Sequence, residues 1–332
     1  MLKQKYTVLG VFLSILFIYL AFRKVDLRAL ETRLESADLA LILLALLPLS
    51  ASYIIRTFLW RTILQTFKNV DFSNTFSALM IGFFANNVLP GRVGEFIRAY
   101  ILGRRENVGK TSVLGTIVVE RLFDIFTLLI FLMLTVFVFP TPEWVKHVAS
   151  TTSVILLTAV AVSYLFVLRQ NFLVEKFKSK MFFLSKPKKQ FFTTKLDSFI
   201  SGLKILKTPR LILTIFVLSL LAWLLASMSM LLTFKSLHIN VPTIYGPLFV
   251  LSVVNLGLIV PSSPGYVGTY QFLCVIALSY FSVDKESALS FSIIHHALWY
   301  LPLTIVGMIF LWRENLSLTK LGMIKQEAGK IV

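Results

Sequence analysis

The chain has 332 residues, of which 57% are hydrophobic and 14% aromatic, and the apolar residues form long uncharged runs separated by short charged ones. This pattern is typical of a polytopic membrane protein. The formal net charge of +17 is concentrated in particular loops, which argues against a nucleic-acid-binding surface, and a single cysteine excludes an internal disulfide or a cysteine-based metal cluster.

Six apolar segments are each near the ~20 residues that a helix needs to cross a bilayer. The first follows a basic flank like that of a signal peptide, but it is long for one and lacks a small-residue cleavage site, so we expect a retained helix. Two further apolar runs each lead into a break that contains proline and glycine. The predicted spans are residues 6–22, 39–60, 111–139, 148–168, 211–234 and 287–312, and the interrupted runs are residues 72–89 and 244–260.

The distribution of lysine and arginine predicts the orientation of the chain. If the N-terminus is cytoplasmic, the cytoplasmic segments hold 22 of the 33 basic residues, so the positive-inside rule places both termini in the cytoplasm. The most basic segment runs from Arg169 to Arg210 (residues 169–210) and holds 11 basic and 2 acidic residues interleaved with aromatic ones. It predicts interfacial helices that bind anionic lipid head groups, although an ordinary positive-inside loop explains the same charges.

A motif of the form P-G-x-V-G-x-aromatic occurs twice, 174 residues apart, as VLPGRVGEF in residues 88–96 and SSPGYVGTY in residues 262–270. The same offset aligns the flanking apolar segments, which predicts one membrane domain, residues 1–332, with repeat halves at residues 39–139 and 211–312.

The two interrupted runs allow two topologies. If each is a re-entrant hairpin, the basic residues fall on one side and the halves are inverted copies, as in many transporters. If both runs cross the bilayer fully, which their length permits, the motifs are surface loops. We favour the first arrangement: an all-α fold with about six full transmembrane helices and two re-entrant broken-helix hairpins.

The backbone of the two breaks suits a polar interior. Non-helical backbone at membrane depth must be satisfied by protein or by a water-filled cavity. Proline cannot continue a helix, glycine permits positive φ, and the half-helix that follows presents free N–H groups that attract anions. The residues concerned are Pro90, Gly91 and Gly94 in the first break and Pro264, Gly265 and Gly268 in the second.

Charged residues accompany the first break inside an apolar region. Arg92 adds a full positive charge beside the predicted helix N-terminus, so a phosphate-bearing head group is the expected guest. A plain hairpin turn, in which Glu95 complements the helix dipole, explains the motif without a ligand. It explains less well why Arg98 lies there too.

A second charged cluster lies in the sequence VVERLFDIF, within the predicted span at residues 111–139. Glu120 is roughly 15 Å along that helix, near mid-bilayer, and shares a face with Asp124, which can pair with Arg121. Ionisable groups at such depth mark transport sites by default. A purely structural pair, Arg121–Asp124 or Arg92–Glu120, would also account for them.

The second half carries milder polar candidates. His295 occupies the position in the second half that corresponds to Arg121 in the first, because the two are 174 residues apart. His295 could bind phosphate or exchange a proton, although a histidine hydrogen-bonded between helices is the simpler explanation, and the adjacent His296 points about 100° away. Gln271 is a milder polar candidate of the same kind.

Three motifs in order, NNVLPGRVGEFIRAYIL, VVERLFDIF and PSSPGYVGTYQF, resemble those of the lysylphosphatidylglycerol synthase transmembrane-region family. The resemblance covers essentially the whole chain. It implies a bacterial or archaeal plasma-membrane (inner-membrane) protein that moves membrane phospholipids or polyprenyl-linked lipids between leaflets. By motif match, the implied functional positions are Pro90, Gly91, Arg92, Gly94, Glu95, Glu120, Arg121, Asp124, Pro264, Gly265 and Gly268.

The bifunctional members of that family continue into a soluble aminoacyl-transferase domain. This chain stops at Val332, so we do not expect lipid aminoacylation.

The sequence therefore favours a lipid flippase rather than an enzyme, with a central polar cavity for a charged head group and with no cofactor. Homo-oligomerisation is left open. One alternative is a non-transporting scaffold for envelope enzymes that docks through residues 169–210. Another is a membrane-embedded enzyme that acts on lipid head groups.

Overall fold

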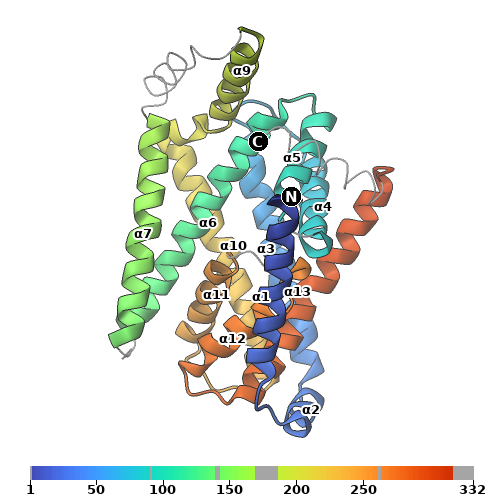
Figure 1. The fold of residues 1–332 in the computed structure, drawn as a ribbon, viewed down its shortest axis with the longest axis vertical. Coiled ribbons are helices and arrows are strands. Elements are labelled where there is room, and N and C mark those ends of the chain that lie inside the picture. The colour runs from blue at the N-terminus through green and yellow to red at the C-terminus, as the bar shows by residue number, and fades with distance from the viewer. Residues whose placement is uncertain (1, 90–91, 139–142, 169–185, 260–262, 317–332) are drawn as a thin grey trace.

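The computed structural model describes residues 2–89, 92–138, 143–168, 186–259 and 263–316, where the regular elements are all helical (Figure 1). This confirms the predicted all-α class for that part of the chain. The helices are α1 (Leu2–Phe22), α2 (Leu27–Glu35), α3 (Leu39–Leu64), α4 (Phe72–Val88), α5 (Gly94–Arg105), α6 (Lys110–Val138), α7 (Glu143–Leu168), α9 (Lys186–Gly202), η2 (Lys204–Lys207), α10 (Pro209–Ser236), α11 (Tyr245–Gly257), η3 (Pro264–Tyr266), α12 (Thr269–Ser279) and α13 (Lys285–Arg313).

Four described helices are long and apolar enough to cross a membrane: α3, α6, α10 and α13, of 26 to 29 residues. A chain with several such helices is a multi-pass membrane protein. The other two predicted spans coincide with α1 and α7. Their crossing, and thus the count of six, stays a prediction.

Aspartate side chains fix the first turns of three helices. Asp26, Asp38 and Asp284 accept hydrogen bonds from backbone N–H groups of α2, α3 and α13 at 2.8–3.3 Å. These N–H groups have no partner within their helix, and such a cap contributes about 1 kcal/mol. Because Arg33 of α2 also lies 3.9 Å from Asp284, α2 packs at the start of α13.

The helix bounds follow the 174-residue offset of the sequence. Shifted by that offset, α5 starts at residue 268 and α6 at residue 284, one residue before the observed starts of α12 and α13. The packing has a matching pattern, because α4 packs on α13 while α11 packs on α6, and α3 lies along α10. Each set of four helices, α3 to α6 and α10 to α13, therefore packs the first helix of its interrupted pair against the last long helix of the other set.

Each interrupted pair turns back on itself. Lys68 before α4 pairs with Glu106 after α5 at 3.3 Å, so this pair begins and ends at the same end of the molecule. In the second pair, the rings of Phe249 in α11 and Phe281 after α12 are 5.5 Å apart. Figure 1 shows α4 and α5 in the upper half of the bundle and α11 and α12 in the lower half, so the two pairs open toward opposite ends.

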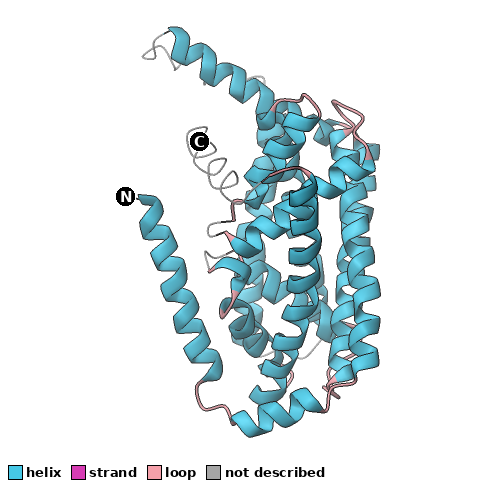
Figure 2. Ribbon diagram, turned by 90° about the vertical axis from the view of Figure 1, so that its right-hand side faces the viewer, coloured by secondary structure: helices cyan, strands magenta, loops and turns pink. Residues whose placement is uncertain are grey.

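Helices α1, α7 and α9 lie outside the two sets of four. α1 packs on α12, where the Phe17 and Phe272 rings stack at 4.7 Å, and diverges from the bundle toward its first residues (Figure 2). α9 meets α6 where the hydroxyls of Ser201 and Ser112 lie 3.0 Å apart. Within the basic segment, residues 169–185 lie outside the described residues, so its interfacial position stays a prediction.

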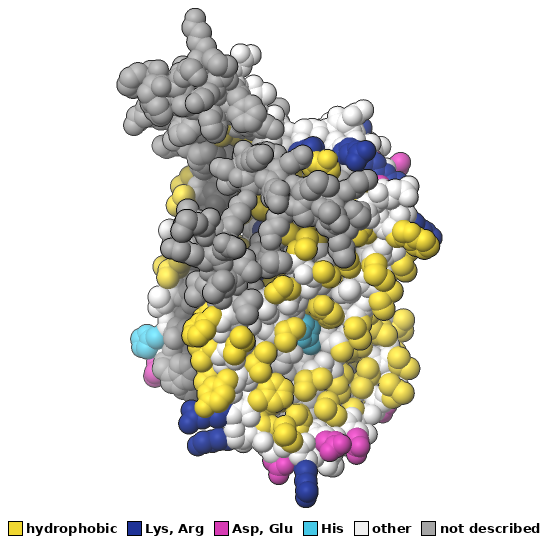
Figure 3. All heavy atoms as spheres, turned by 45° about the vertical axis from the view of Figure 1, so that its right-hand side comes forward, with side chains coloured by type: hydrophobic (Ala, Val, Ile, Leu, Met, Phe, Trp, Pro, Cys, Tyr) yellow, Lys and Arg dark blue, Asp and Glu magenta, His cyan; other side chains and the backbone are white. Residues whose placement is uncertain are grey.

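Large apolar side chains point outward from the long helices. Leu43 and Leu47 on α3 and Leu213 and Val217 on α10 are each more than half exposed. Figure 3 shows apolar side chains over much of one face, with charged side chains at its two ends. Such a continuous apolar surface is unfavourable in water, whereas the hydrocarbon core of a bilayer accommodates it.

Candidate functional site

The two breaks in the helices contact each other. We call residues 89–93, between α4 and α5, the first break, and residues 258–268, between α11 and α12, the second break. The guanidinium of Arg92 donates to the main-chain carbonyl of Leu258 and lies 5.3 Å from the centroid of the Tyr266 ring. The two P-G-x-V-G motifs, far apart in the sequence, therefore form one site.

Glycine is required where the second break meets the first. Gly265 has φ of 65°, which disfavours other residues, and a Cβ there would lie 2.6 Å from the Tyr300 ring and 3.3 Å from the Asn87 carbonyl oxygen. At the start of α5, a Cβ on Gly94 would collide with the carbonyl oxygen of Gly82. A glycine at these two positions is therefore a packing requirement, of the contact between the breaks at Gly265 and of the contact between α4 and α5 at Gly94.

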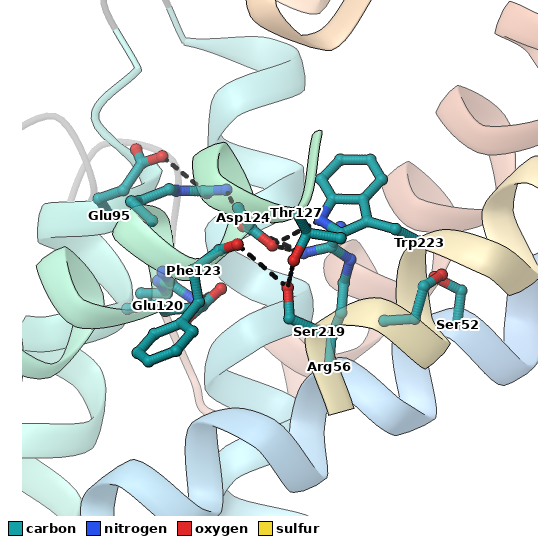
Figure 4. Close-up of polar contacts among 12 residues, drawn as sticks. Ser52, Arg56, Glu95, Glu120, Phe123, Asp124, Thr127, Ser219 and Trp223 are labelled. Atoms are coloured by element: carbon teal, nitrogen blue, oxygen red, sulfur yellow. Dashed lines mark hydrogen bonds and ion pairs between the residues drawn. The ribbon is translucent and has the colours of Figure 1, made fainter. Parts of the chain in front are cut away.

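Asp124 is the centre of a buried polar cluster between α3, α6 and α10 (Figure 4). Its carboxylate accepts from Arg56 at 3.0 and 3.2 Å, from Arg121 at 3.2 Å and from the indole N–H of Trp223 at 2.8 Å. The Arg56 guanidinium also lies 4.1 Å from the centroid of the Trp223 ring. Both Asp124 and Arg56 are buried, so their charges are compensated by protein groups and not by water.

Arg121 links this cluster to the start of α5. One guanidinium nitrogen lies 3.2 Å from Asp124 and another lies 3.0 Å from Glu95. Asn86 of α4 donates to Glu95 at 3.4 Å and accepts from the Gly94 N–H at 2.7 Å. The side chain of Asn86 on α4 therefore partly caps the N-terminus of α5.

Arg98 and Glu120 form a deeply buried ion pair. Their side chains are 2% and 1% exposed, and Arg98 Nη1 lies 3.0 Å from Glu120 Oε2. The guanidinium lies 4.7 Å from the centroid of the Trp60 ring, whose indole donates to Thr116 at 3.0 Å. Arg98 Nε and Nη2 have no hydrogen-bond partner among the described residues. A buried donor without a partner costs about 1–3 kcal/mol, so both nitrogens favour an additional acceptor.

The cluster carries one positive charge in excess. Each of its three carboxylates lies within 4.0 Å of an arginine, whereas Arg92 has no carboxylate at that distance in the part of the chain that the structure describes. Among the same residues, no three His, Cys, Asp or Glu side chains are grouped as a metal site. The cluster therefore offers a ligand the N–H donors of guanidinium groups. The paired residues are Arg56, Arg98 and Arg121 with Asp124, Glu120 and Glu95.

The second break is held by neutral groups. Gln271 Oε1 accepts from the Gly268 N–H at 2.8 Å, and Gln271 Nε2 lies 2.8 Å from His296 Nδ1. His296 Nε2 in turn lies 2.9 Å from the carbonyl oxygen of Gly265. These hydrogen bonds join the break to α12 and α13, and we call Gly265, Gly268, Gln271 and His296 the histidine relay.

The structure brings most of the predicted residues together. Arg92, Gly94, Glu95, Arg98, Glu120, Arg121 and Asp124 lie at the first break or in the adjoining cluster, and Pro264, Gly265, Gly268 and Gln271 lie at the second break. Pro90 and Gly91 lie outside the described residues. The Arg121–Asp124 pair is confirmed at 3.2 Å. The alternative Arg92–Glu120 pair is wrong, because Glu120 pairs with Arg98.

His295 lies apart from both breaks. Its Nδ1 is 3.1 Å from the Thr233 hydroxyl of α10, and its ring stacks on Phe291 at 5.4 Å. The adjacent His296 is the histidine that contacts the second break. A transport role for His295 stays a prediction, and the described contacts do not join it to the charged cluster.

Sequence reasoning missed four residues of the site: Arg56, Asn86, Trp223 and His296. Arg56 had a usable signal, because it is an arginine inside the predicted span at residues 39–60. Like Glu120, it is an ionisable side chain inside a predicted membrane span, and such residues mark functional sites. Asn86 and Trp223 carry no charge, and only the fold shows which polar atoms they contact.

Comparisons with known proteins give a consistent set of relatives. A family model described as "Lysylphosphatidylglycerol synthase TM region" matches residues 7–307. The UPF0104 membrane protein MJ1595 of Methanocaldococcus jannaschii is 25% identical over 329 residues, which cover 93% of this chain and 96% of that protein. UPF0104 membrane protein MJ1078 of the same organism is 23% identical over 237 residues, which cover 71% of this chain and 97% of that protein.

A third relative is similar over a shorter stretch. The protein named Glycosyltransferase AglD of Haloferax volcanii is 30% identical over 122 residues, which cover 36% of this chain and 20% of AglD. No solved structure matches.

Proposed function

Because this chain belongs to the lysylphosphatidylglycerol synthase transmembrane-region family, we propose that it is a flippase that moves a lipid or lipid-linked molecule with a phosphate-bearing head group between leaflets. The match over residues 7–307 confirms the family resemblance that the three motifs indicated. In this proposal the head group passes along the first break and the charged cluster, while the lipid tails stay in the hydrocarbon of the bilayer.

The observation that carries the proposal is the surplus of guanidinium donors where the two breaks meet. A charged head group that crosses a bilayer unaided loses its hydration and gains no polar partner. Arg92, which has no carboxylate within 4.0 Å in the described chain, supplies a positive charge at the contact between the breaks. Arg98 supplies two buried guanidinium nitrogens without described partners in the adjoining cluster. Together they can replace water around phosphate oxygens.

The proposed mechanism requires that the two interrupted helix pairs are re-entrant hairpins in inverted repeat halves. Each pair begins and ends at one end of the molecule, and the two pairs open to opposite ends, which supports this arrangement. Alternating packing of two such halves would expose a central site to one leaflet and then to the other. By the charge distribution, α4 and α5 would open to the cytoplasm and both termini would be cytoplasmic, in the plasma membrane of a prokaryote.

Cysteine labelling tests this topology. In a Cys274→Ser background, single cysteines replace Asn69 and Arg104, which flank α4 and α5, or Asn240 and Ser282, which flank α11 and α12. All four native residues are exposed. An impermeant thiol reagent should reach the first two positions from one side of the membrane and the last two from the other. Labelling of Asn69→Cys and Arg104→Cys from different sides would contradict the hairpin.

A head-group-modifying enzyme is the second candidate function. The observation that favours it is the similarity to the protein named Glycosyltransferase AglD, which covers 36% of this chain. Mass spectrometry separates the two functions, since a flippase leaves the mass of the lipid unchanged while an enzyme alters it.

Lipid movement in proteoliposomes tests the proposal directly. The purified chain is reconstituted with fluorescent phosphatidylglycerol, phosphatidylcholine or a fluorescent polyprenyl phosphate, and a membrane-impermeant quencher reports the fraction of probe in the outer leaflet. We expect faster exchange between leaflets than in protein-free vesicles for at least one phosphate-bearing lipid. Equal rates with and without the protein for all three probes would refute the flippase function and leave the enzyme and scaffold alternatives.

A further inference from the structure

The histidine relay fixes the proton positions of His296. A carbonyl oxygen can only accept, so the contact with Gly265 places the imidazole proton on Nε2. Nδ1 is then an acceptor, and the amide nitrogen of Gln271 donates to it. The amide oxygen of Gln271 is left facing the Gly268 N–H, which it accepts. Each donor in the relay meets an acceptor, and the imidazole is neutral.

A second proton on His296 disrupts this arrangement. Protonated Nδ1 would point an N–H at the NH₂ group of Gln271, so that two donors face each other. Rotating the Gln271 amide by half a turn restores that contact but turns the NH₂ group toward the Gly268 N–H at the start of α12. Either way one hydrogen bond of the second break is lost. The relay therefore has no arrangement that accepts the proton and keeps the break closed.

The surroundings of His296 are mainly aromatic. Three aromatic rings pack around the imidazole, with centroids of Tyr270, Trp299 and Tyr300 at 4.9, 4.8 and 5.5 Å. Aromatic faces attract cations. The titratable side chains near it are two tyrosines, from α12 and from α13 itself, and the adjacent His295, whose charge would repel a charge on His296. Among the described contacts, α2, α3, α4 and α10, which also pack on α13, bring no carboxylate or cation to His296.

The second break also touches the residue that we assign to the head group. Arg92 binds the Leu258 carbonyl and lies over Tyr266, whose ring is 6.2 Å from that of Trp299. Gly265, which accepts from His296, packs beside Asn87 of α4. A movement of residues 264–268 would therefore alter the contact between Arg92 and the Tyr266 ring.

We propose that His296 is a proton-binding residue whose protonation opens the second break at residues 264–268, so that lipid movement is coupled to protons. The coupling rests on the proposed flippase function, whereas the opening of the break does not. The ligand of this site is a proton, taken up at Nδ1 and released from it in each cycle.

Hydrogen exchange of the whole protein in lipid nanodiscs tests the opening. Between about pH 8 and about pH 5, histidine is the side chain whose ordinary pKa allows a change of charge. After correction for the intrinsic pH dependence of exchange, we expect exchange in residues 263–272 to rise about tenfold on acidification, since one net hydrogen bond is lost. His296→Gln keeps a donor for Gly265 and an acceptor for Gln271 but cannot be protonated, so its exchange should not respond to pH.

The neighbouring histidine provides the matched control. His295→Gln should keep the full acid response, because His295 binds Thr233 and not the break. A response that persists in His296→Gln, or that is absent in the wild type, overturns the proposal. Labelling the wild type with ¹⁵N-histidine requires no substitution of His296, and an imidazole of His296 that stays neutral down to pH 5 overturns it as well.

The proteoliposome assay separates this proposal from the flippase function. If lipid exchange in the wild type accelerates on acidification and His296→Gln removes the acceleration, both hold. If the wild type moves no lipid at either pH, the flippase function fails while hydrogen exchange still decides whether His296 opens the break. Lipid exchange that is rapid but independent of pH refutes proton coupling alone.

Discussion

The first break adjoins four arginines and three carboxylates, whereas the second break, with the same P-G-x-V-G pattern, is closed by an amide, an imidazole and backbone groups. In the first region the single carboxylate of Asp124 accepts hydrogen bonds from Arg56, Arg121 and Trp223. In the second region the corresponding connection runs through Gln271 and His296 without a formal charge. Two segments with the same sequence pattern thus differ in the kind of interaction that holds them.

This difference separates two roles that a flippase needs. Buried ion pairs are strongly coupled, and removing one partner leaves a costly charge, so the first region provides a fixed electrostatic environment. A chain of neutral hydrogen bonds costs little to break and responds to a single proton. In the proposed flippase, the first region would therefore bind the head group and the second would move.

Reversing the Arg121–Asp124 pair should have the largest effect on stability. In Arg121→Asp with Asp124→Arg, the new arginine would face Arg56 and the new aspartate would face Glu95, so each reversed charge meets a like charge. We expect the free energy of unfolding to fall by at least about 3–5 kcal/mol, and size-exclusion chromatography to show little folded protein. A folded double variant with the wild-type melting temperature would contradict the assignment of these ion pairs.

Breaking the Arg98–Glu120 pair from one side should cost more than removing both partners. Glu120→Ala leaves the buried guanidinium of Arg98 without its carboxylate and should destabilise the protein by about 3–5 kcal/mol. The double variant Arg98→Met with Glu120→Leu replaces both charges by apolar groups and should recover a large part of that loss. Denaturant titrations in detergent of the single and double variants measure the coupling, and additive losses would show that the two side chains do not interact.

At the second break the expected losses are smaller. Gly268 has φ of 84°, and a Cβ there would lie 2.5 Å from the Ser14 carbonyl oxygen of α1. Gly268→Ala should therefore cost about 1–3 kcal/mol. Gly109→Ala is the control, because its Cβ would meet only the flexible Ser112 side chain, at 3.2 and 3.9 Å. Thermal unfolding of the two variants compares them, and equal melting temperatures would argue against a tight contact between α1 and the break.

Arg92→Gln should change stability least. No described carboxylate lies within 4.0 Å of Arg92, and glutamine retains an N–H group that can donate to the Leu258 carbonyl. We expect a change below about 1 kcal/mol in the free energy of unfolding. A loss as large as that of Glu120→Ala would mean that Arg92 is a structural residue of the bundle.

Hydropathy and spacing were sufficient for much of the fold. The span predicted at residues 111–139 matches α6, because a long apolar run has few alternatives to a helix in a membrane. The Arg121–Asp124 contact followed from its i,i+3 spacing within one helix.

Contacts between helices could not be predicted in the same way. The Arg56–Asp124 pair joins residues 68 positions apart, and nothing local specifies it. The choice between His295 and His296 depends on the rotation of α13 about its axis. A helix that is apolar on all sides does not reveal that rotation in its sequence.

The central claim is that the positive charge of Arg92 serves the head group rather than the fold, and the rate of lipid exchange in Arg92→Gln proteoliposomes tests it most directly. Arg28→Gln, which removes an exposed arginine of α2, is the control for net charge. For a phosphate-bearing lipid we predict a rate about tenfold or more below wild type in Arg92→Gln, at an unchanged melting temperature, and a wild-type rate in Arg28→Gln. A wild-type rate in Arg92→Gln would contradict the account.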